Sequence, residues 1–286
     1  MLTGLDHVVV AVAAIEPAIA SYRLLLGRRP CWRAAGEGGV IVALFKVGDI
    51  AIELMAPDGD GPVADRLRAV LDASGEGLAS LAFATDDMDA THALMQRRGL
   101  EPEPIISASS FDAQSGHSRA WRRTRVGAAA SGGTRLFVLE RDRPLPDSSL
   151  EAPSEASATA LDHAVIRTQN PDRTAALYGA RLGLDLRLDR ATPAWGARFQ
   201  FFRCGQTILE IVQDLKTPDP QAPDHLWGLT WKTPNAAATR ARLAAAGVEV
   251  SPLRPGRKPA TEVFTVKSQT CSVPTLFLQA AAKEPT

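Results

Sequence analysis

The chain repeats itself, and this repeat constrains the fold more than any other feature of the sequence. The segment LDHVV at 5–9 returns as LDHAV at 161–165, an offset of 156 residues. IEL at 52–54 returns as LEI at 209–211, an offset of 157, and matches that begin at Leu78 return at an offset of 148. The offset changes only across loop-like segments, so the sequence indicates a tandem duplication.

A second, weaker repeat lies within each half. A β-branched run, a helix-spaced stretch that ends at Gly27, and three more strand-like runs predict one β-α-β-β-β module. The predicted elements are a strand at 5–12, a helix at 15–26 and strands at 30–35, 40–47 and 50–56, followed by a second module from 78 to 140 with its helix at 89–98. We therefore expect an α+β fold of two domains, 1–143 and 161–282, each with two such modules around a cupped mixed sheet, joined by a Pro- and Ser-rich linker at 144–160.

Composition excludes several classes of protein. Thirty-two basic and 32 acidic side chains cancel in 286 residues, which argues against nucleic acid or an anionic membrane as partner. No apolar run reaches the ~18 residues of a membrane span, and the acidic Asp6 and Glu16 do not suit a signal peptide. Three scattered cysteines suit buried thiols in a reducing compartment. We expect a cytoplasmic protein, as a monomer or a homodimer.

The repeated motifs resemble the vicinal oxygen chelate superfamily, which includes glyoxalase I, methylmalonyl-CoA epimerase, extradiol dioxygenases and fosfomycin-resistance proteins. The resemblance rests on a strand that opens Leu-Asp-His, a helix that ends Leu-Gly, a fourth strand with Leu-Glu, and GLASLAFATDD at 77–87. It covers nearly the whole chain, apart from the linker and the last residues. It specifies the fold better than the reaction, because one fold can carry many chemistries.

The resemblance implies a divalent metal held from four equivalent strand positions in each half. These positions are His7, Glu53, Ser80 and Glu140 in the first half, and His163, Glu210, Gly228 and Gln279 in the second. Ser80 and Gly228 stand where a second histidine would fall, which argues against an iron-dependent extradiol dioxygenase. The first half is the better metal candidate, with His7, Glu53 and Glu140 as ligands. The weaker set is His163, Glu210 and Gln279.

Each candidate ligand also has a structural interpretation. His7 fits a ligand or a buried histidine held by a neighbouring turn. Glu53 lies in an apolar strand and needs a cation, donors or water, because a bare buried carboxylate is costly. Glu140 fits a ligand, a proton shuttle or a solvated strand end with a local ion pair. Imidazole and carboxylate donors suit Zn, Mn, Fe, Ni or Co and do not distinguish among them.

An arginine-rich run beyond the second predicted helix suggests a binding surface. Arg119, Trp121 and Arg123 alternate onto one face of a predicted strand and would cradle an aromatic or anionic substrate. A solvated edge strand guarded by charge is the competing interpretation. His117 just upstream is a candidate general base.

The leading functional hypothesis is a metal-dependent lyase or isomerase of the glyoxalase type, acting on a small oxygenated organic molecule. In that hypothesis the metal binds two neighbouring substrate oxygens, and an unligated Glu53 or Glu140 moves the proton. The alternative is a metal-free protein that binds or sequesters a small molecule, as resistance members of the superfamily do.

Overall fold

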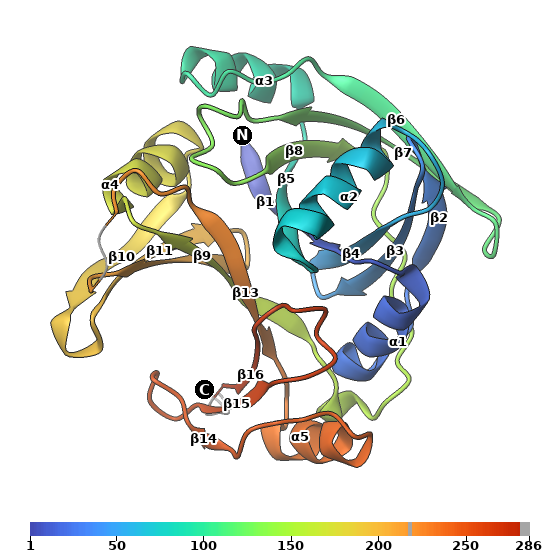
Figure 1. The fold of residues 1–286 in the computed structure, drawn as a ribbon, viewed down its shortest axis with the longest axis vertical. Helices are drawn as coiled ribbons and strands as arrows, with labels where there is room; N and C mark the ends of the chain where they lie inside the picture. Colours follow the sequence, from blue (N-terminus) through green and yellow to red (C-terminus); the bar gives the residue numbers. More distant parts are fainter. Residues whose placement is uncertain (217–218, 281–286) are drawn as a thin grey trace, which may run out of the picture. The chain divides into compact units, whose positions relative to one another are not determined.

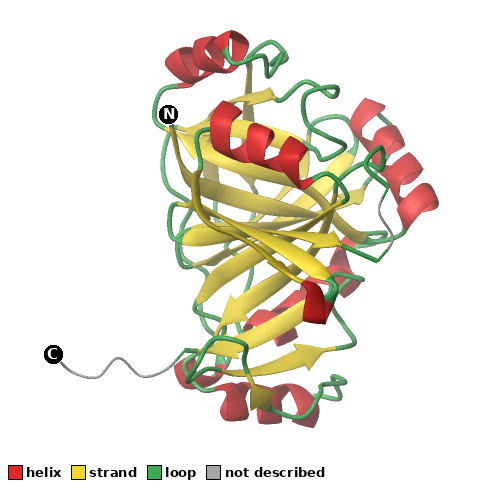
Figure 2. Cartoon of the chain, turned by 90° about the vertical axis from the view of Figure 1, so that its left-hand side faces the viewer, coloured by secondary structure: helices red, strands yellow, loops and turns green. Residues whose placement is uncertain are grey.

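The computed structural model describes residues 1–216 and 219–280, and its strands form two eight-stranded mixed sheets (Figures 1 and 2). The strand order is β2-β3-β4-β1-β5-β8-β7-β6 in one sheet and β10-β11-β12-β9-β13-β16-β15-β14 in the other. Adding eight to each strand number of the first sheet gives the second. The α+β class and the tandem β-α-β-β-β modules are confirmed. The predicted domain limits stay a prediction, and the limit at 282 lies outside the described residues.

The elements of the first half follow the expected order, with one helix that the sequence did not predict. They are β1 (Leu2–Ala11), α1 (Ile15–Leu26), β2 (Trp32–Gly36), β3 (Val40–Val47), β4 (Ile50–Pro57), α2 (Pro62–Ser74), β5 (Gly77–Thr85), α3 (Met88–Arg97), β6 (Ile106–Asp112), β7 (His117–Arg125) and β8 (Leu136–Arg141). The unpredicted helix is α2, which buries only Ala64 and Leu67. So short a buried stripe is a weak periodic signal.

The second half repeats this order with two changes. Its elements are β9 (Ala160–Thr168), α4 (Pro171–Thr174), the π-helix η2 (Ala175–Arg181), β10 (Asp185–Thr192), β11 (Ala197–Cys204), β12 (Thr207–Asp214), β13 (His225–Lys232), α5 (Ala236–Ala245), β14 (Arg254–Pro255), β15 (Glu262–Val266) and β16 (Thr275–Gln279), with 3-10 turns at Ser154–Ala156 and Pro193–Trp195. The counterpart of α1 is split into α4 and η2. No counterpart of α2 occurs in the part of this half that the structure describes.

Local sequence explains where the helices begin and end. Asp87 accepts a hydrogen bond from the Ala90 backbone N–H at the start of α3, and Asn235 does the same for α5. These short polar side chains satisfy N–H groups that have no partner within the helix. At the end of α1, Gly27 adopts φ 70°, and its N–H bonds to the Arg23 carbonyl. Glycine takes this left-handed conformation without a steric penalty.

The chain divides into two compact units, and each unit draws on both halves of the sequence. Unit 1 comprises Met1–Val9, Leu78–Pro144 and His163–Trp227. Unit 2 comprises Val10–Gly77, Leu145–Asp162 and the chain from Gly228 onward. Residues far apart in the sequence therefore meet inside one unit.

Arginines at helix ends tie the modules together within each unit. In unit 1, Arg98 after α3 donates to the Arg181 carbonyl at 3.1 Å, and Arg181 donates to the Ala130 carbonyl at 3.3 Å. In unit 2, Arg242 of α5 donates to the Leu24 carbonyl near the end of α1 at 2.5 Å. A cation suits these positions because the last carbonyls of a helix are unpaired and carry partial negative charge.

The predicted linker, from Leu145 onward, is part of unit 2 and packs on its first module. Glu151 forms ion pairs with Arg23 at 2.6 Å and Arg29 at 2.5 Å, and these partners lower the pKa of Glu151 to about 2. Ser148 accepts a hydrogen bond from the Lys46 backbone N–H at 2.9 Å. The segment therefore has a defined course along the first module rather than acting as a free tether.

Hydrogen bonds from the helices define which face of each module they cover. Thr85 of β5 bonds Thr91 of α3 at 2.8 Å, and Thr233, directly after β13, bonds Thr239 of α5 at 2.6 Å. We call this side of a module its helix-covered face and the opposite side its helix-free face. Because side chains alternate along a strand, the register of each pair assigns every other residue to one face.

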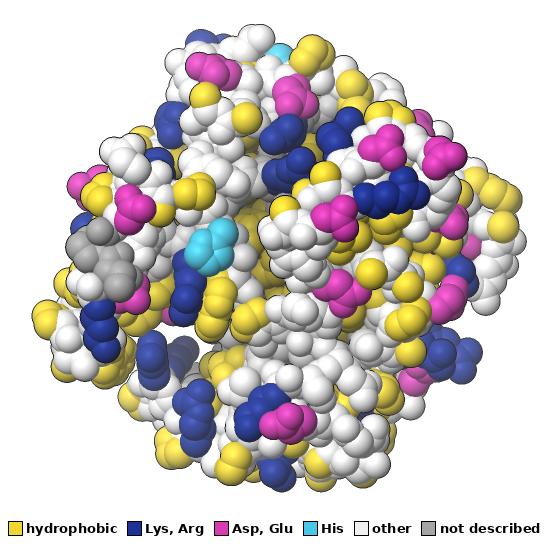
Figure 3. Space-filling model, viewed as in Figure 1, with side chains coloured by type: hydrophobic (Ala, Val, Ile, Leu, Met, Phe, Trp, Pro, Cys, Tyr) yellow, Lys and Arg dark blue, Asp and Glu magenta, His cyan; other side chains and the backbone are white. Residues whose placement is uncertain are grey.

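Charged side chains of both signs are interspersed on the visible surface (Figure 3), in keeping with the formal net charge of zero. Among residues 1–216 and 219–280, no helix combines the length and the apolar character that crossing a membrane requires.

Candidate functional site

Glu140 lies on the helix-covered face of β8. Register pairs Ala84 with Leu139, so Glu140 lies level with Thr85, which faces α3. Glu140 Oε1 accepts a hydrogen bond from the Met88 backbone N–H at 3.1 Å, and Oε2 lies 3.4 Å from the Arg122 guanidinium. Glu140 thus holds the first turn of α3, where a carboxylate satisfies an unpaired N–H group.

Gln279 stabilises the first turn of a helix in the same way in the duplicated module. Its Oε1 accepts a hydrogen bond from the Ala236 backbone N–H, the first residue of α5, at 2.7 Å. Two positions that the family resemblance offered as metal ligands therefore both stabilise the beginning of a helix. Metal ligation by either would require these bonds to be exchanged.

The strand register also separates the positions where a second histidine and a third ligand were expected. Ser80 lies one residue before Leu81, which pairs with Leu136, whereas Glu140 lies four residues beyond Leu136. Ser80 and Glu140 are thus five positions apart on neighbouring strands, about 16 Å along the sheet, and they face opposite sides. Gly228 and Gln279 have the same relation on β13 and β16, since Leu229 pairs with Thr275.

His163 and Glu210 are brought together on the helix-free face of unit 1. His163 Nε2 lies 3.1 Å from Glu210 Oε2, and both side chains are largely buried. Glu210 pairs with Phe201, whose neighbour Phe202 packs against Tyr178 of η2, so Glu210 faces away from the helix. This pair is the part of the weaker ligand set that the fold assembles.

Glu53 lies on the helix-free face of its own module in unit 2. It pairs with Leu44, whose neighbour Phe45 packs against Tyr22 of α1 with ring centroids 6.3 Å apart. Leu44 belongs to an apolar cluster with Trp32. Glu53 is 8% exposed, so its carboxylate is largely buried beside apolar residues.

His7 is held by a neighbouring carboxylate. Its Nδ1 lies 2.5 Å from Asp6 Oδ1, and Arg141 binds both oxygens of Asp6, at 2.5 and 2.6 Å. Burial disfavours the Asp6 anion, but its bonds to His7 and Arg141 outweigh burial and hold the pKa of Asp6 well below its usual range. A carboxylate on Nδ1 fixes the imidazole ring and leaves Nε2 as its second nitrogen.

The predicted cradle lies on the helix-free face of β7. Arg122 pairs with Glu140 on the helix-covered face, so Arg119, Trp121 and Arg123 face the other way. The Arg119 guanidinium lies 4.8 Å from the Trp121 ring centre, and its Nε donates to Ser110 at 2.9 Å. β7 lies between β8 and β6 in the sheet and Arg119 is 7% exposed, so the interpretation as a solvated edge strand is wrong.

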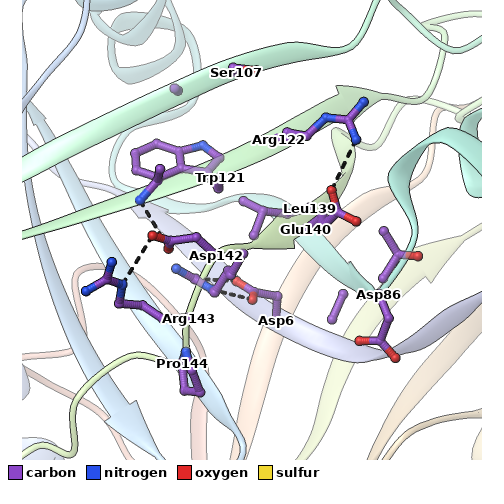
Figure 4. Close-up of a pocket in the computed structure, with 15 residues that line it drawn as sticks. Asp6, Asp86, Ser107, Trp121, Arg122, Leu139, Glu140, Asp142, Arg143 and Pro144 are labelled. Carbon is purple, nitrogen blue, oxygen red and sulfur yellow. Dashed lines mark hydrogen bonds and ion pairs between the residues drawn. The ribbon is translucent and has the colours of Figure 1, made fainter.

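A pocket of about 660 Å³ in unit 1 is lined by residues of both faces, with Trp121 and Leu139 from the helix-free face and Arg122 and Glu140 from the helix-covered face (Figure 4). Trp121, Leu139 and Ala108 supply apolar lining. Of the predicted substrate-binding residues, Arg119, Arg123 and His117 are not among the lining residues. Four carboxylates and three guanidinium groups also line it, namely Asp6, Asp86, Glu140 and Asp142 with Arg122, Arg141 and Arg143. These seven lining groups sum to one net negative charge, while the Arg119 guanidinium, stacked on the Trp121 ring, adds a positive charge next to the pocket.

The described donors do not fit a divalent metal site. Residues 1–216 and 219–280 contain no group of three or more His, Cys, Asp or Glu side chains arranged to hold an ion. His163 and Glu210 supply two donors, while sites of the zinc type use at least three protein ligands. The oxygens of Glu140 and Gln279 already bond to helix N–H groups.

Comparison with known families decides the identity. A family described as "Glyoxalase-like domain" matches residues 5–183, which is more than half of the chain. The chain belongs to the glyoxalase-like domain family. A second family, described as "Glyoxalase/Bleomycin resistance protein/Dioxygenase superfamily", matches residues 160–271. The two matches confirm a two-domain member of the vicinal oxygen chelate superfamily. No curated protein matches the sequence significantly.

Solved structures share the fold of this glyoxalase-like protein. A mutant of 4-hydroxymandelate synthase from Streptomyces coelicolor is 15% identical with a TM-score of 0.68, covering 99% of this chain and 95% of that one. A Mn(II)-bound glyoxalase from Novosphingobium aromaticivorans is 17% identical with a TM-score of 0.65, covering 98% and 83%. A hypothetical protein from Staphylococcus aureus is 8% identical with a TM-score of 0.64, covering 96% and 98%. At these identities the likeness concerns the fold.

Sequence reasoning missed the charged groups that organise the pocket. Asp6 was treated as part of a fold motif, although its carboxylate binds Arg141, 135 positions away. The signal for Glu140 was available, because Leu136, Val138 and Glu140 alternate on one face and the first two are fully buried. Such spacing predicts a side chain that points toward the covering helix.

Proposed function

We propose that this glyoxalase-like protein binds a small, planar, oxygenated organic molecule in the pocket of unit 1, without a resident divalent ion. The observation that carries this proposal is the Trp121 ring on the pocket wall, stacked beneath Arg119 at 4.8 Å. An aromatic platform with polar groups around it is typical of small-molecule sites. A cytoplasmic location and a monomeric or homodimeric state belong to the same proposal.

The charge of the lining narrows the ligand class. Arg141 is bound by both oxygens of Asp6, and Arg122 lies 2.7 Å from Asp89 and 3.4 Å from Glu140. Arg143 likewise pairs with Asp142 at 3.2 Å. The three guanidinium groups that line the pocket are thus each paired with a carboxylate, which disfavours binding of an anion. A neutral ring with hydroxyl or keto oxygens fits best. Its hydroxyl groups can donate hydrogen bonds to the carboxylates, and its ring can stack on the indole of Trp121.

Thermal-shift and calorimetric titrations with neutral aromatic diols and ketones, each matched to a carboxylate of equal size, test this proposal. A bound ligand at one hundred times its Kd should stabilise the fold by about 2.7 kcal/mol. Trp121→Ala should lose the response, whereas Trp195→Ala, which alters an indole that is 55% exposed, should retain it. Equal binding by the Trp121→Ala variant, or stronger binding of the carboxylates, would refute the proposal.

A second candidate function is a metal-dependent lyase or isomerase, favoured by the His163–Glu210 pair. Two ligands held 2.0–2.2 Å from one tetrahedral ion lie about 3.3–3.6 Å apart, and these two atoms, separated by 3.1 Å, are close to that spacing. Elemental analysis after incubation with Zn, Mn, Fe, Ni and Co separates the candidates. One equivalent of metal that is lost in Glu210→Ala supports the enzyme; absence of metal from every sample supports the metal-free binder.

A further inference from the structure

Unit 2 contains a second pocket, of about 370 Å³, whose lining is polar. It lies between the start of α1, the residue that precedes β5 and the loop between β15 and β16. The lining residues are Pro17, Ala18, Ser21, Glu76, Lys267, Ser268, Gln269, Thr270, Cys271 and Ser272. None of them belongs to the pocket of unit 1.

The duplication gives this pocket a counterpart in unit 1. The offset of 156 relates Pro17 to Arg173, and the offset of 148 relates Glu76 to Asp224. The loop before β16 matches the loop before β8, since Leu81 pairs with Leu136 and Leu229 with Thr275. Its backbone is retained: Cys271 and Ser272 have φ values of 48° and 59°, where the first half has Gly132 and Gly133 at 67° and 107°.

In unit 1 the counterpart is filled by a guanidinium group of the chain itself. Arg173 donates to Asp224 Oδ1 at 2.7 Å and to the Ala222 carbonyl at 2.8 Å. The Asp224 side chain has no exposed surface, so its charge depends on this partner. The fold of unit 1 therefore holds a guanidinium group, that of Arg173, at the position that corresponds to the pocket of unit 2.

In unit 2 the carboxylate is retained, while the arginine is replaced. Pro17 occupies the position of Arg173, and it carries no charge. Glu76 Oε1 accepts a hydrogen bond from the Ala13 backbone N–H at 2.8 Å, which leaves Oε2 for another donor. The lysine of the pocket, Lys267, forms an ion pair with Glu249 at 3.1 Å.

A buried hydroxyl group next to the pocket also lacks its partner. Tyr178 in unit 1 bonds Thr134 at 3.4 Å, whereas its duplicate Tyr22 is fully buried and its hydroxyl has no hydrogen-bond partner among the described residues. The residue that corresponds to Thr134 is Val273, which cannot hydrogen-bond. Burial raises the pKa of Tyr22, and Cys271 and Glu76, which both line the pocket, add to this effect.

We propose that the pocket of unit 2 binds the guanidinium group of a ligand, which takes the place that the Arg173 side chain fills in unit 1. Glu76 supplies the charge, and the hydroxyl group of Ser21 supplies a further hydrogen-bond acceptor. The shared chemistry is an alkylguanidinium, carried either by a free small molecule or by an arginine side chain of a peptide.

Isothermal titration with L-arginine and L-citrulline tests the charge requirement, because the ureido group of citrulline is a neutral isostere of guanidinium. Arginine should bind at least about tenfold more tightly than citrulline, as expected for hydrogen bonds to a charged group. Agmatine and an acetylated Gly-Arg-Gly amide distinguish the two sources: tight binding of agmatine alone indicates a small-molecule ligand, and tight binding of the peptide indicates a protein.

Two variants test the site by independent routes. Glu76→Gln removes the charge and should weaken arginine binding at least about tenfold. Pro17→Arg supplies a guanidinium group from the chain itself at the position of Arg173, which should compete with the ligand for Glu76 and weaken arginine binding while circular dichroism stays unchanged. Asp65→Asn, on the exposed surface of α2, is the matched control and should bind as the unaltered chain does. Equal affinity for citrulline, unchanged binding by Glu76→Gln, or no binding of any guanidinium compound at about 10 mM would overturn the proposal.

Discussion

Replacing Arg141 by methionine should destabilise unit 1 substantially, because it removes the bidentate partner of a buried carboxylate. The Asp6 and Arg141 side chains are 10% and 14% exposed, and two charge-assisted hydrogen bonds of 2.5 and 2.6 Å join them. Breaking a buried pair from one side costs about 3–5 kcal/mol. His7 remains as a partner for Asp6 at 2.5 Å, so we expect about 2–4 kcal/mol for Arg141→Met.

Urea unfolding at neutral pH measures this change. The double variant Asp6→Asn with Arg141→Met leaves no buried anion at this pair and should lose only about 1 kcal/mol, roughly 1–3 kcal/mol less than Arg141→Met alone. Arg143→Met is the control: its side chain is 67% exposed and pairs with Asp142 at 3.2 Å, so its loss should be under about 0.5 kcal/mol. Equal losses for Arg141→Met and Arg143→Met would refute this reasoning.

The same pair predicts how stability depends on pH. The pKa of Asp6 is lower in the folded protein than in the unfolded chain, where a carboxyl of this type titrates near 3.9. The unfolded chain therefore binds more protons, and the Asp6 contribution is complete at neutral pH and lost as the pH falls below about 4. Arg141→Met raises that pKa, so its free energy of unfolding should fall less steeply with acid. A steeper fall would contradict the assignment.

Three further outcomes follow from the structure. Val273→Thr should give the Tyr22 hydroxyl a partner and raise the free energy of unfolding by about 0.5–1.5 kcal/mol in urea; a loss would contradict the match with Thr134. Glu140→Ala should cost about 0.5–2 kcal/mol and speed amide hydrogen exchange in the first turn of α3, whereas unchanged exchange would argue against a helix-stabilising role. Burial raises the pKa of Cys204 to about 12, and burial with the nearby Glu76 raises that of Cys271 to about 12, so mass spectrometry after brief treatment with a thiol reagent at pH 8 should find both largely unmodified; rapid modification of either would contradict this assignment.

The duplication made the fold predictable, because matching apolar strands and helix ends recur at nearly constant offsets. The repeated sequence pattern did not show whether a polar residue lies on the helix-covered or the helix-free face of its module. Glu53 and Glu140 both look like carboxylates on apolar strands, yet Glu53 lies on the helix-free face and Glu140 holds the first turn of α3. Only strand register separates the two cases, and register depends on contacts between distant segments.

The pocket of unit 2 could not be predicted from the sequence, for a different reason. Pro17 and Glu76 are 59 positions apart and neither residue type is unusual where it stands. Their relation becomes clear from the duplicate, where the corresponding residues Arg173 and Asp224 are in contact at 2.7 Å. A short sequence repeat shows that two segments correspond, whereas a structure shows what the corresponding side chains do.

The central claim is that the helix-free face at Trp121 receives the ligand, and fluorine NMR of the protein labelled with 5-fluorotryptophan tests it most directly. The chain has five tryptophans, and Trp121→Phe assigns one of the five resonances. Titration with a neutral aromatic diol should shift the Trp121 resonance saturably and leave the exposed Trp195 resonance in place. A saturable shift elsewhere, with the Trp121 resonance unmoved, would contradict the account.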